Sequence, residues 1–145
     1  MFLLENHVQI LNDSYHKHFG VYLLEDEGNL VQQFMSARFV IVSHDTQSDP
    51  VFNFANLIAQ YLWEMDWETF TKLPSRLSAE PMLQQERQVF LEKTTQNGFV
   101  DNYSGTRISA TGKRFEIQNA KIWNLYHNDL YYGQAATFSS WRFFE

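Results

Sequence analysis

The hydrophobic positions divide the chain into an amino-terminal part with helical spacing and a carboxyl-terminal part with strand-like alternation. Over residues 2–18 the apolar side chains recur with the period of a helix, which predicts an amphipathic helix ending near Gly20. Its apolar stripe is formed by Leu4, Val8, Leu11 and Tyr15. A second short helix is predicted over residues 26–36. The first helix is expected either to pack on its own domain or to pair with a copy of itself in a partner.

The apolar run at residues 39–43 predicts a strand that is buried on both faces. A strand with one face in water alternates apolar and polar residues, and this run does not alternate. Its second face must therefore be covered by the amino-terminal helix or by another subunit. Asp49 and Pro50 then predict a turn, because proline fixes its own φ and restricts the residue before it. A short strand from Val51 follows, and Asn56 is predicted to cap the next helix.

Short helices occupy the middle of the chain, and strands occupy its last third. Helices are predicted over residues 67–73 and 82–96, with an irregular or single-turn segment over residues 74–81 between them. Strands are predicted over residues 99–108, from residue 114 onward, and over residues 131–141 after a tight turn at Asn128-Asp129. The apolar alternation changes phase near Gln118-Asn119, which predicts a β-bulge there.

This succession of two strands, several short helices and a three-stranded antiparallel meander follows the plan of a PAS domain. The predicted fold class is α+β: a PAS-like, five-stranded antiparallel sheet with short helices on one face and an amino-terminal flanking helix. Residues 1–36 are assigned to the helical flank and residues 37–145 to the PAS-like domain. A chain of 145 residues is long enough to bury a sizeable core.

Several short motifs between about residues 36 and 141 point to one family. They are Ser43-His44, Asp49-Pro50-Val-Phe-Asn-Phe-Ala-Asn56, Trp67, Pro74-Ser-Arg-Leu-Ser-Ala-Glu-Pro81, Tyr103-Ser-Gly105, Arg107-Ile-Ser, Gly112, Arg114-Phe, Trp123-Asn-Leu and Gly133-Gln-Ala-Ala-Thr-Phe138. In this order they resemble the MEKHLA family, a PAS-like domain of small bacterial proteins and of plant class-III homeodomain-leucine-zipper regulators. The resemblance implies a sensory or regulatory module. The chain has no homeodomain or zipper, so the DNA-regulating role of the plant proteins does not transfer.

The composition excludes several classes of partner. The chain has 11 Lys and Arg against 17 Asp and Glu and no basic run, so neither nucleic acid nor an anionic membrane surface is predicted as a partner. No apolar run reaches the ~18 residues of a membrane span, and a soluble cytoplasmic protein is expected. The chain has no cysteine, and His16 and His18 lack the i, i+4 spacing of a metal pair. No metal site is predicted.

The cofactor is left unknown, and two that PAS-like sensors carry lack their residues here. The flavin chemistry of the light-sensing class needs a reactive cysteine, and the chain has none. Haem needs an axial ligand, usually histidine, and the 82–96 helix that would supply it contains no histidine. Gln134 resembles a flavin-contacting glutamine of those sensors. Its offset from Gly133 differs by one residue, which predicts that its side chain faces the other side of the sheet.

The candidate ligand-binding residues are cations and large aromatic side chains within these motifs. Arg76, Arg107 and Arg114 are each either paired with an acidic residue (Glu80, Asp101 or Glu116) or presented to a ligand carboxylate, and Arg76 is the first choice for the ligand-facing cation. The predicted apolar walls are Trp63, Trp67, Phe90, Tyr103 and Trp123. The same aromatic residues also suit a solid core. Gln134 and His44 complete the set, although a turn-organising role, bonded to Asp45 or Asp49, is favoured for His44.

Two functions are predicted as alternatives. The first is a small-molecule sensor with a pocket between the sheet and the helices, whose signal leaves through dimer or partner contacts. The second is a ligand-free dimerisation or protein-interaction module. In both, a homodimer through the sheet face and the amino-terminal helix is expected. An enzyme is not predicted, because Ser43, His44 and Asp45 follow one another along a strand and their side chains point apart.

Overall fold

The protein is built around one antiparallel sheet, described by a computed structural model over residues 3–79 and 81–144, with the side chains of residues 81–84 and 87 outside that description. The strands are β1 (Val40–His44), β2 (Phe52–Ala55), β3 (Phe99–Ile108), β4 (Arg114–His127), β5 (Leu130–Phe138) and β6 (Ser140–Phe143). Their order is β2-β1-β5-β4-β3, and β6 pairs with β4. The predicted fold class is confirmed.

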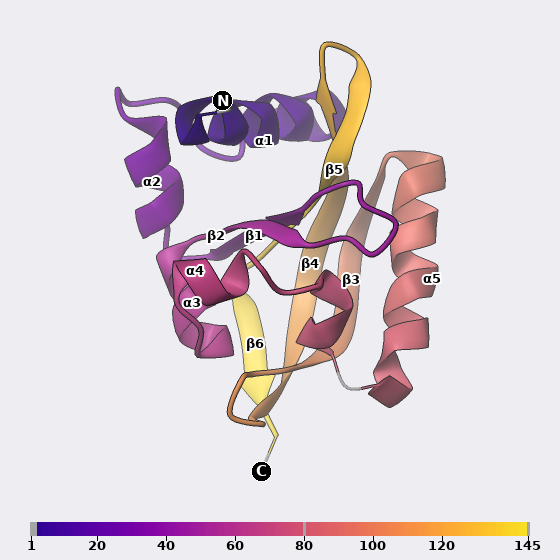
Figure 1. Cartoon of the computed structure of the whole chain (residues 1–145). Coiled ribbons are helices and arrows are strands. Elements are labelled where there is room, and N and C mark those ends of the chain that lie inside the picture. Colours follow the sequence, from indigo (N-terminus) through magenta and orange to yellow (C-terminus); the bar gives the residue numbers. More distant parts are fainter. Residues whose placement is uncertain (1–2, 80, 145) are drawn as a thin grey trace.

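Helices flank this sheet on both sides (Figure 1). They are α1 (Leu4–Phe19), α2 (Leu30–Ser36), α3 (Leu57–Trp63), α4 (Trp67–Phe70), the 3-10 turn η1 (Ser75–Ser78) and α5 (Pro81–Asn97). α1 and α2 lie together beside one end of the sheet, whereas α5 runs alongside β3. Two of the predicted helices are shorter than expected: α2 begins at Leu30 and α4 ends at Phe70.

Asn56 connects three of these elements, which goes beyond its predicted role as a cap. Its side-chain oxygen accepts hydrogen bonds from the backbone N–H groups of Ala59 at the start of α3 and of Ile41 in β1. Its amide nitrogen donates to the carbonyl groups of Phe34 in α2 and of Phe39. Because Asn56 is completely buried, these bonds satisfy backbone groups that water cannot reach.

The predicted bulge in β4 is confirmed and explains why the last predicted strand is two strands. Asn119 has a φ of +54°, and the apolar residues on its two sides, Ile117 and Ala120, face the same core cluster. Before the bulge β4 pairs with β6, and after it β4 pairs with β5. The sheet therefore has six strands rather than five, since Ser139, opposite the bulge, belongs to neither.

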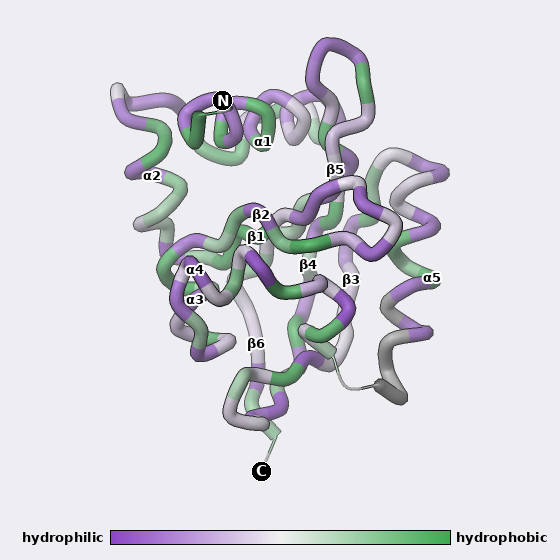
Figure 2. Tube along the Cα trace, viewed as in Figure 1, coloured by the Kyte–Doolittle hydropathy of each residue, from purple (hydrophilic) through white to green (hydrophobic). Residues whose placement is uncertain are grey.

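Both faces of the sheet are covered, as the apolar run at residues 39–43 predicted. All five residues of β1 are buried. On one face, helices α3 and α4 pack over a cluster that includes Val42, Phe52 and Phe115. On the other, α1 and α2 pack over Ile41, Phe54, Trp123 and Leu125. The hydrophobic side of α1 faces the sheet (Figure 2). A second copy of the chain would therefore meet α1 rather than a bare sheet over these residues.

Candidate ligand-binding cavity

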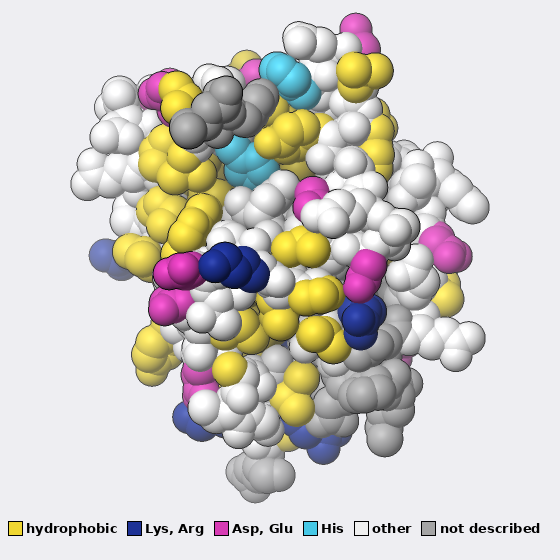
Figure 3. Space-filling view, viewed as in Figure 1, with side chains coloured by type: hydrophobic (Ala, Val, Ile, Leu, Met, Phe, Trp, Pro, Cys, Tyr) yellow, Lys and Arg dark blue, Asp and Glu magenta, His cyan; other side chains and the backbone are white. Residues whose placement is uncertain are grey.

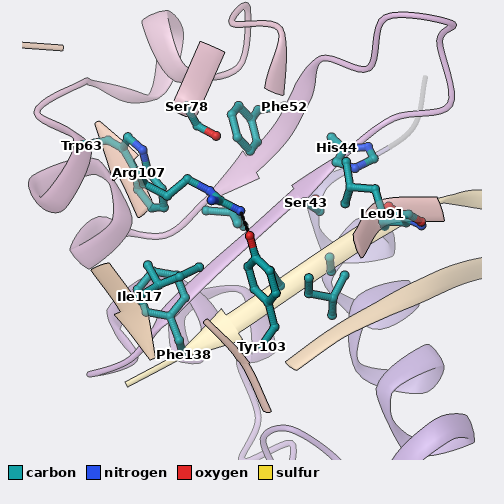
Figure 4. A pocket seen from close by; sticks show the side chains of 15 residues that line it. Ser43, His44, Phe52, Trp63, Ser78, Leu91, Tyr103, Arg107, Ile117 and Phe138 are labelled. Atoms are coloured by element: carbon teal, nitrogen blue, oxygen red, sulfur yellow. Dashed lines mark hydrogen bonds between the residues drawn. The ribbon is translucent and has the colours of Figure 1, made fainter. Parts of the chain in front are cut away.

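A cavity of about 50 Å³ lies on the face of the sheet opposite α1. Strands β1, β3, β4 and β5 form its floor, and residues of α3, η1 and α5 close it. Its apolar wall includes Val42, Phe52, Ile117 and Phe138, and its polar side chains include His44, Ser78, Tyr103, Arg107 and Gln134 (Figure 4). Since one water needs roughly 10–15 Å³ on this measure, the space holds about three to five water-sized spheres.

This volume excludes the large cofactors of sensory domains. Pockets for drug-sized molecules measure about 300–1,000 Å³, so neither a flavin nor a haem fits the cavity of about 50 Å³. The chain also has no cysteine for a flavin adduct. The residues present are thus unsuited to either cofactor.

Arg107 supplies the positive charge of the cavity. Only 8% of its surface is exposed. One terminal guanidinium nitrogen, Nη2, donates a hydrogen bond to the hydroxyl of Tyr103 at 3.0 Å, and the other, Nη1, donates to the backbone oxygen of Thr106 at 2.9 Å. Gly105 makes this arrangement possible, because a side chain there would collide with the Tyr103 hydroxyl. Among the described residues no carboxylate forms an ion pair with Arg107. Of the acidic partners predicted for the arginines, Glu80 lies outside the described residues.

Trp63 adds a polar group that has no bonding partner. The side chain is 2% exposed and lines the cavity, with its ring edge against Phe70 and Phe115. Its indole nitrogen Nε1 has no hydrogen-bond acceptor within the described part of the chain. Buried N–H groups are normally hydrogen-bonded. This residue was predicted only as an apolar wall, and nothing in the sequence indicates that its nitrogen lacks a partner.

Gln134 corrects a prediction from the sequence. Its side chain lines the cavity, and its nitrogen Nε2 donates to the backbone oxygen of Leu91 in α5 and to the side-chain oxygen of Asn124, both at 3.1 Å. The opposite face had been expected. The strand register explains this direction: Gln134 lies directly opposite Asn124 of β4, and directly opposed residues of antiparallel strands share one face of the sheet. Both side chains face α5, where Asn124 donates to the backbone oxygen of Thr95.

His44 lines the cavity and also organises the turn after β1. Its Nδ1–H donates to the backbone oxygen of Asp45 at 2.9 Å, where a carboxylate partner had been considered. Ser43 precedes it and directs its hydroxyl to the other face of the sheet, toward His7 of α1. The expectation that these adjacent side chains point apart is therefore confirmed.

The other predicted site residues lie outside the cavity. Arg76, the first choice for a ligand-facing cation, does not line the cavity. It is half exposed on η1, and its Nε donates to the carboxylate of Asp49 at 3.1 Å. The 3-10 turn directs Ser75 and Ser78 inward instead. Trp67 packs against Phe54 in the cluster beneath α1 and α2. The remaining two predicted wall residues, Trp123 and Phe90, are also not among the lining residues, and each packs against a neighbouring element.

Trp123 is completely buried under α1, where its Nε1 donates to the backbone oxygen of Leu11 at 3.2 Å. Phe90 packs edge to face against Tyr103, a lining residue, with the two ring centroids 4.5 Å apart. Ser78 and Leu91 do line the cavity and were not predicted. Ser78 is fully buried on the single turn predicted at residues 74–81. The sequence predicts the turn but not which of its side chains face inward, so Ser78 could not be identified as a lining residue.

A buried polar cluster on the opposite face holds α1 to the sheet. His7 lies within hydrogen-bond distance of the hydroxyls of Ser43, at 2.9 Å, and Tyr132, at 2.8 Å. Because the Ser43 hydroxyl donates to Asn53, it accepts the N–H of His7, whose other ring nitrogen then accepts from Tyr132. Burial lowers the pKa of His7 from 6.5 to about 4, so His7 is neutral at pH 7.

Asn124 lies between this helix and the cavity. Its side-chain oxygen accepts from Gln134, and its backbone oxygen accepts from Nε2 of His18 at 3.2 Å. A continuous series of hydrogen bonds thus runs from a cavity-lining glutamine through β4 to the end of α1. Burial lowers the pKa of His18, which keeps the ring neutral at pH 7.

Lys and Arg side chains are scattered over the face seen in Figure 3. Among the described residues, no three His, Asp or Glu side chains gather as metal ligands. In the same part of the chain, no helix combines the length and the apolar character of a membrane span.

Comparisons with known proteins place this geometry in context. The model of the MEKHLA domain family matches residues 5–143. A PAS domain from Colwellia psychrerythraea superposes with a TM-score of 0.60 at 14% identity, covering 73% of this chain and 89% of that chain. A light-oxygen-voltage domain, described with a flavin analogue, gives 0.61 at 14% identity, with coverages of 82% and 87%. A PAS domain of a two-component sensor histidine kinase gives 0.59 at 12% identity, with coverages of 77% and 90%. No curated protein matches the chain.

Proposed function

Because the chain belongs to the MEKHLA domain family and has the fold of PAS and light-oxygen-voltage domains, we propose that it is a sensory module that binds a small molecule. The observation that carries this proposal is the cavity between the sheet and α5, which holds a buried arginine and an indole N–H for which the described residues offer no acceptor. Buried polar groups of this kind are satisfied by a ligand or by water. The module acts by binding rather than by chemistry.

The signal leaves the cavity through α5 and α1. A ligand that contacts Gln134 changes the hydrogen bonds that this side chain makes to Leu91 of α5 and to Asn124 of β4. Asn124 in turn contacts His18 at the end of α1. A ligand shifts a conformational equilibrium only by its difference in affinity for the two states. The proposed states therefore differ in the contacts of Asn124, and α1 presents the change to a second copy or to another protein.

Native mass spectrometry and an absorption spectrum of the purified chain test the ligand, and a thermal-shift screen of small metabolites extends the test. A binder raises the melting temperature, since it stabilises only the folded state. Hydrogen exchange in α1 then tests the signal: ligand should alter exchange near His18 in the wild type and less so in Asn124→Ala. A screen in which no charged or neutral metabolite binds would refute the proposal.

A ligand-free dimerisation or protein-interaction module is the second candidate. The small volume of the cavity, about 50 Å³, favours it. Val21 and Tyr22, just after α1, are also 60% and 40% exposed. This alternative predicts a dimer at micromolar concentration that is weakened by Tyr22→Ser. Sedimentation equilibrium showing a monomer at all concentrations would exclude the dimer.

A further inference from the structure

We propose that the ligand of the cavity is a short-chain monocarboxylate, such as propionate, whose carboxylate binds between Arg107 and Tyr103. This inference rests on the proposed function and specifies its ligand class. The charge of the cavity, its unused hydrogen-bond donors and its shape each restrict the ligand independently.

The charge of the cavity calls for an anion. Arg107 is 8% exposed, and none of the described side chains that line the cavity is acidic. A buried cation is stable only when it is paired or well hydrogen-bonded. Its observed partners are the neutral Tyr103 hydroxyl and the backbone oxygen of Thr106. No described carboxylate pairs with the Arg107 guanidinium, and one negative charge on a ligand beside it would supply that partner.

The available donors suit a carboxylate. A guanidinium has five N–H groups, and two of those of Arg107 are used by Thr106 and Tyr103. The Tyr103 oxygen accepts from Arg107, which leaves its own O–H to donate, and no described residue accepts that hydrogen. Figure 4 shows the Arg107 and Tyr103 side chains meeting at the Tyr103 hydroxyl, so their unused donors are close together. A planar carboxylate accepts such paired donors well.

The size and the walls of the cavity restrict the rest of the ligand. Space for about three to five water-sized spheres admits roughly four to five non-hydrogen atoms, because covalently bonded atoms lie closer together than separate waters. The apolar lining includes Phe52, Ile117 and Phe138, which favour an apolar tail. A second carboxylate would be buried against these side chains without a partner and is therefore excluded. An inorganic anion of similar size would leave the apolar wall uncovered.

Calorimetric titration of the wild-type chain with propionate and with propionamide tests the charge of the ligand without a mutation. We expect propionate to bind and to raise the melting temperature, and propionamide, which has nearly the same shape but no charge, to bind at least tenfold more weakly. Acetate and succinate test the length and the second charge. Acetate should bind more weakly than propionate, and succinate should not bind.

Two arginine variants identify the residue responsible. Arg107→Gln should weaken propionate binding by about 10- to 100-fold, the usual loss for a charge-assisted hydrogen bond. Arg76→Gln is the matched control, because that arginine is exposed and paired with Asp49, and it should bind as the wild type does. Circular dichroism checks that both variants fold.

The outcomes separate this inference from the proposed function. If propionamide or another neutral molecule binds the wild type as well as propionate does, the carboxylate inference is overturned and the sensory function stands. The same conclusion follows if Arg107→Gln folds and binds propionate normally. If neither this series nor the metabolite screen gives a binder, both are overturned.

Discussion

Acidification should loosen α1 through a single buried side chain, His7. Burial lowers the pKa of His7 to about 4 in the folded chain, against 6.5 when it is exposed. Above pH 6.5 the ring is neutral in both the folded and the unfolded state, so His7 does not lower the free energy of unfolding. Below pH 6.5 the unfolded chain binds a proton that the folded chain does not, so stability falls as the pH falls toward 4.

The magnitude follows from the two pKa values. Linkage between them gives a loss of about 2 kcal/mol from pH 7 to pH 5 and about 3 kcal/mol by pH 4. Urea unfolding of the wild type and of His7→Gln, measured at both ends of this range, isolates the contribution, because other titrating groups cancel in the difference. The glutamine variant, which stays neutral, should lack this part of the pH dependence.

His16→Gln, on the exposed side of the same helix, controls for the loss of a histidine as such. Hydrogen exchange at pH 5 should show α1 opening before the sheet, since His7 bonds α1 to Ser43 and Tyr132. Equal pH slopes for the wild type and His7→Gln would refute the reasoning, because they would mean that His7 charges without penalty in the folded chain.

Three further predictions concern stability and are measured by urea unfolding at pH 7. Asn56→Ala should cost about 3 kcal/mol, since it removes a helix cap and leaves buried backbone groups of α2 and β1 unpaired; a cost below about 1 kcal/mol would show that water replaces these bonds. Gly133→Ala should cost about 3 kcal/mol, because its φ is +148° and a methyl group would strike the carbonyl of His44. Asn119→Ala should cost about 1 kcal/mol for its φ of +54°, whereas Asn119→Gly should be nearly neutral; equal effects of the two would contradict the bulge geometry.

The position of α1 bears on how a signal could leave the molecule. The helix contributes Val8 and Leu11 to the same buried cluster as Trp123 of the sheet. A change that reaches Asn124 therefore acts on a helix that is already part of the core. The assignment of residues 1–36 to a separate flank stays a prediction, although the family model begins at residue 5.

Much of the fold could be predicted from the sequence, because its causes are local. Asn56 precedes an apolar helical stripe, and the phase shift near Asn119 is visible as a change in alternation. Asn128 and Asp129 suit the tight turn that joins β4 and β5, where both adopt positive φ. Each of these signals depends on a few neighbouring residues, so packing elsewhere in the chain does not alter it.

The tertiary structure decided which of the predicted side chains share a site. Arg76 and Arg107 look alike in sequence, yet the 3-10 turn directs one to solvent and β3 directs the other into the cavity. The direction of Gln134 depended on its register opposite Asn124 of β4. His7 meets Tyr132 across 125 positions of sequence. The sequence by itself determined the elements and the family, whereas strand register and helix packing, which depend on contacts between distant residues, decided the cavity, its charge and the contact between α1 and the sheet.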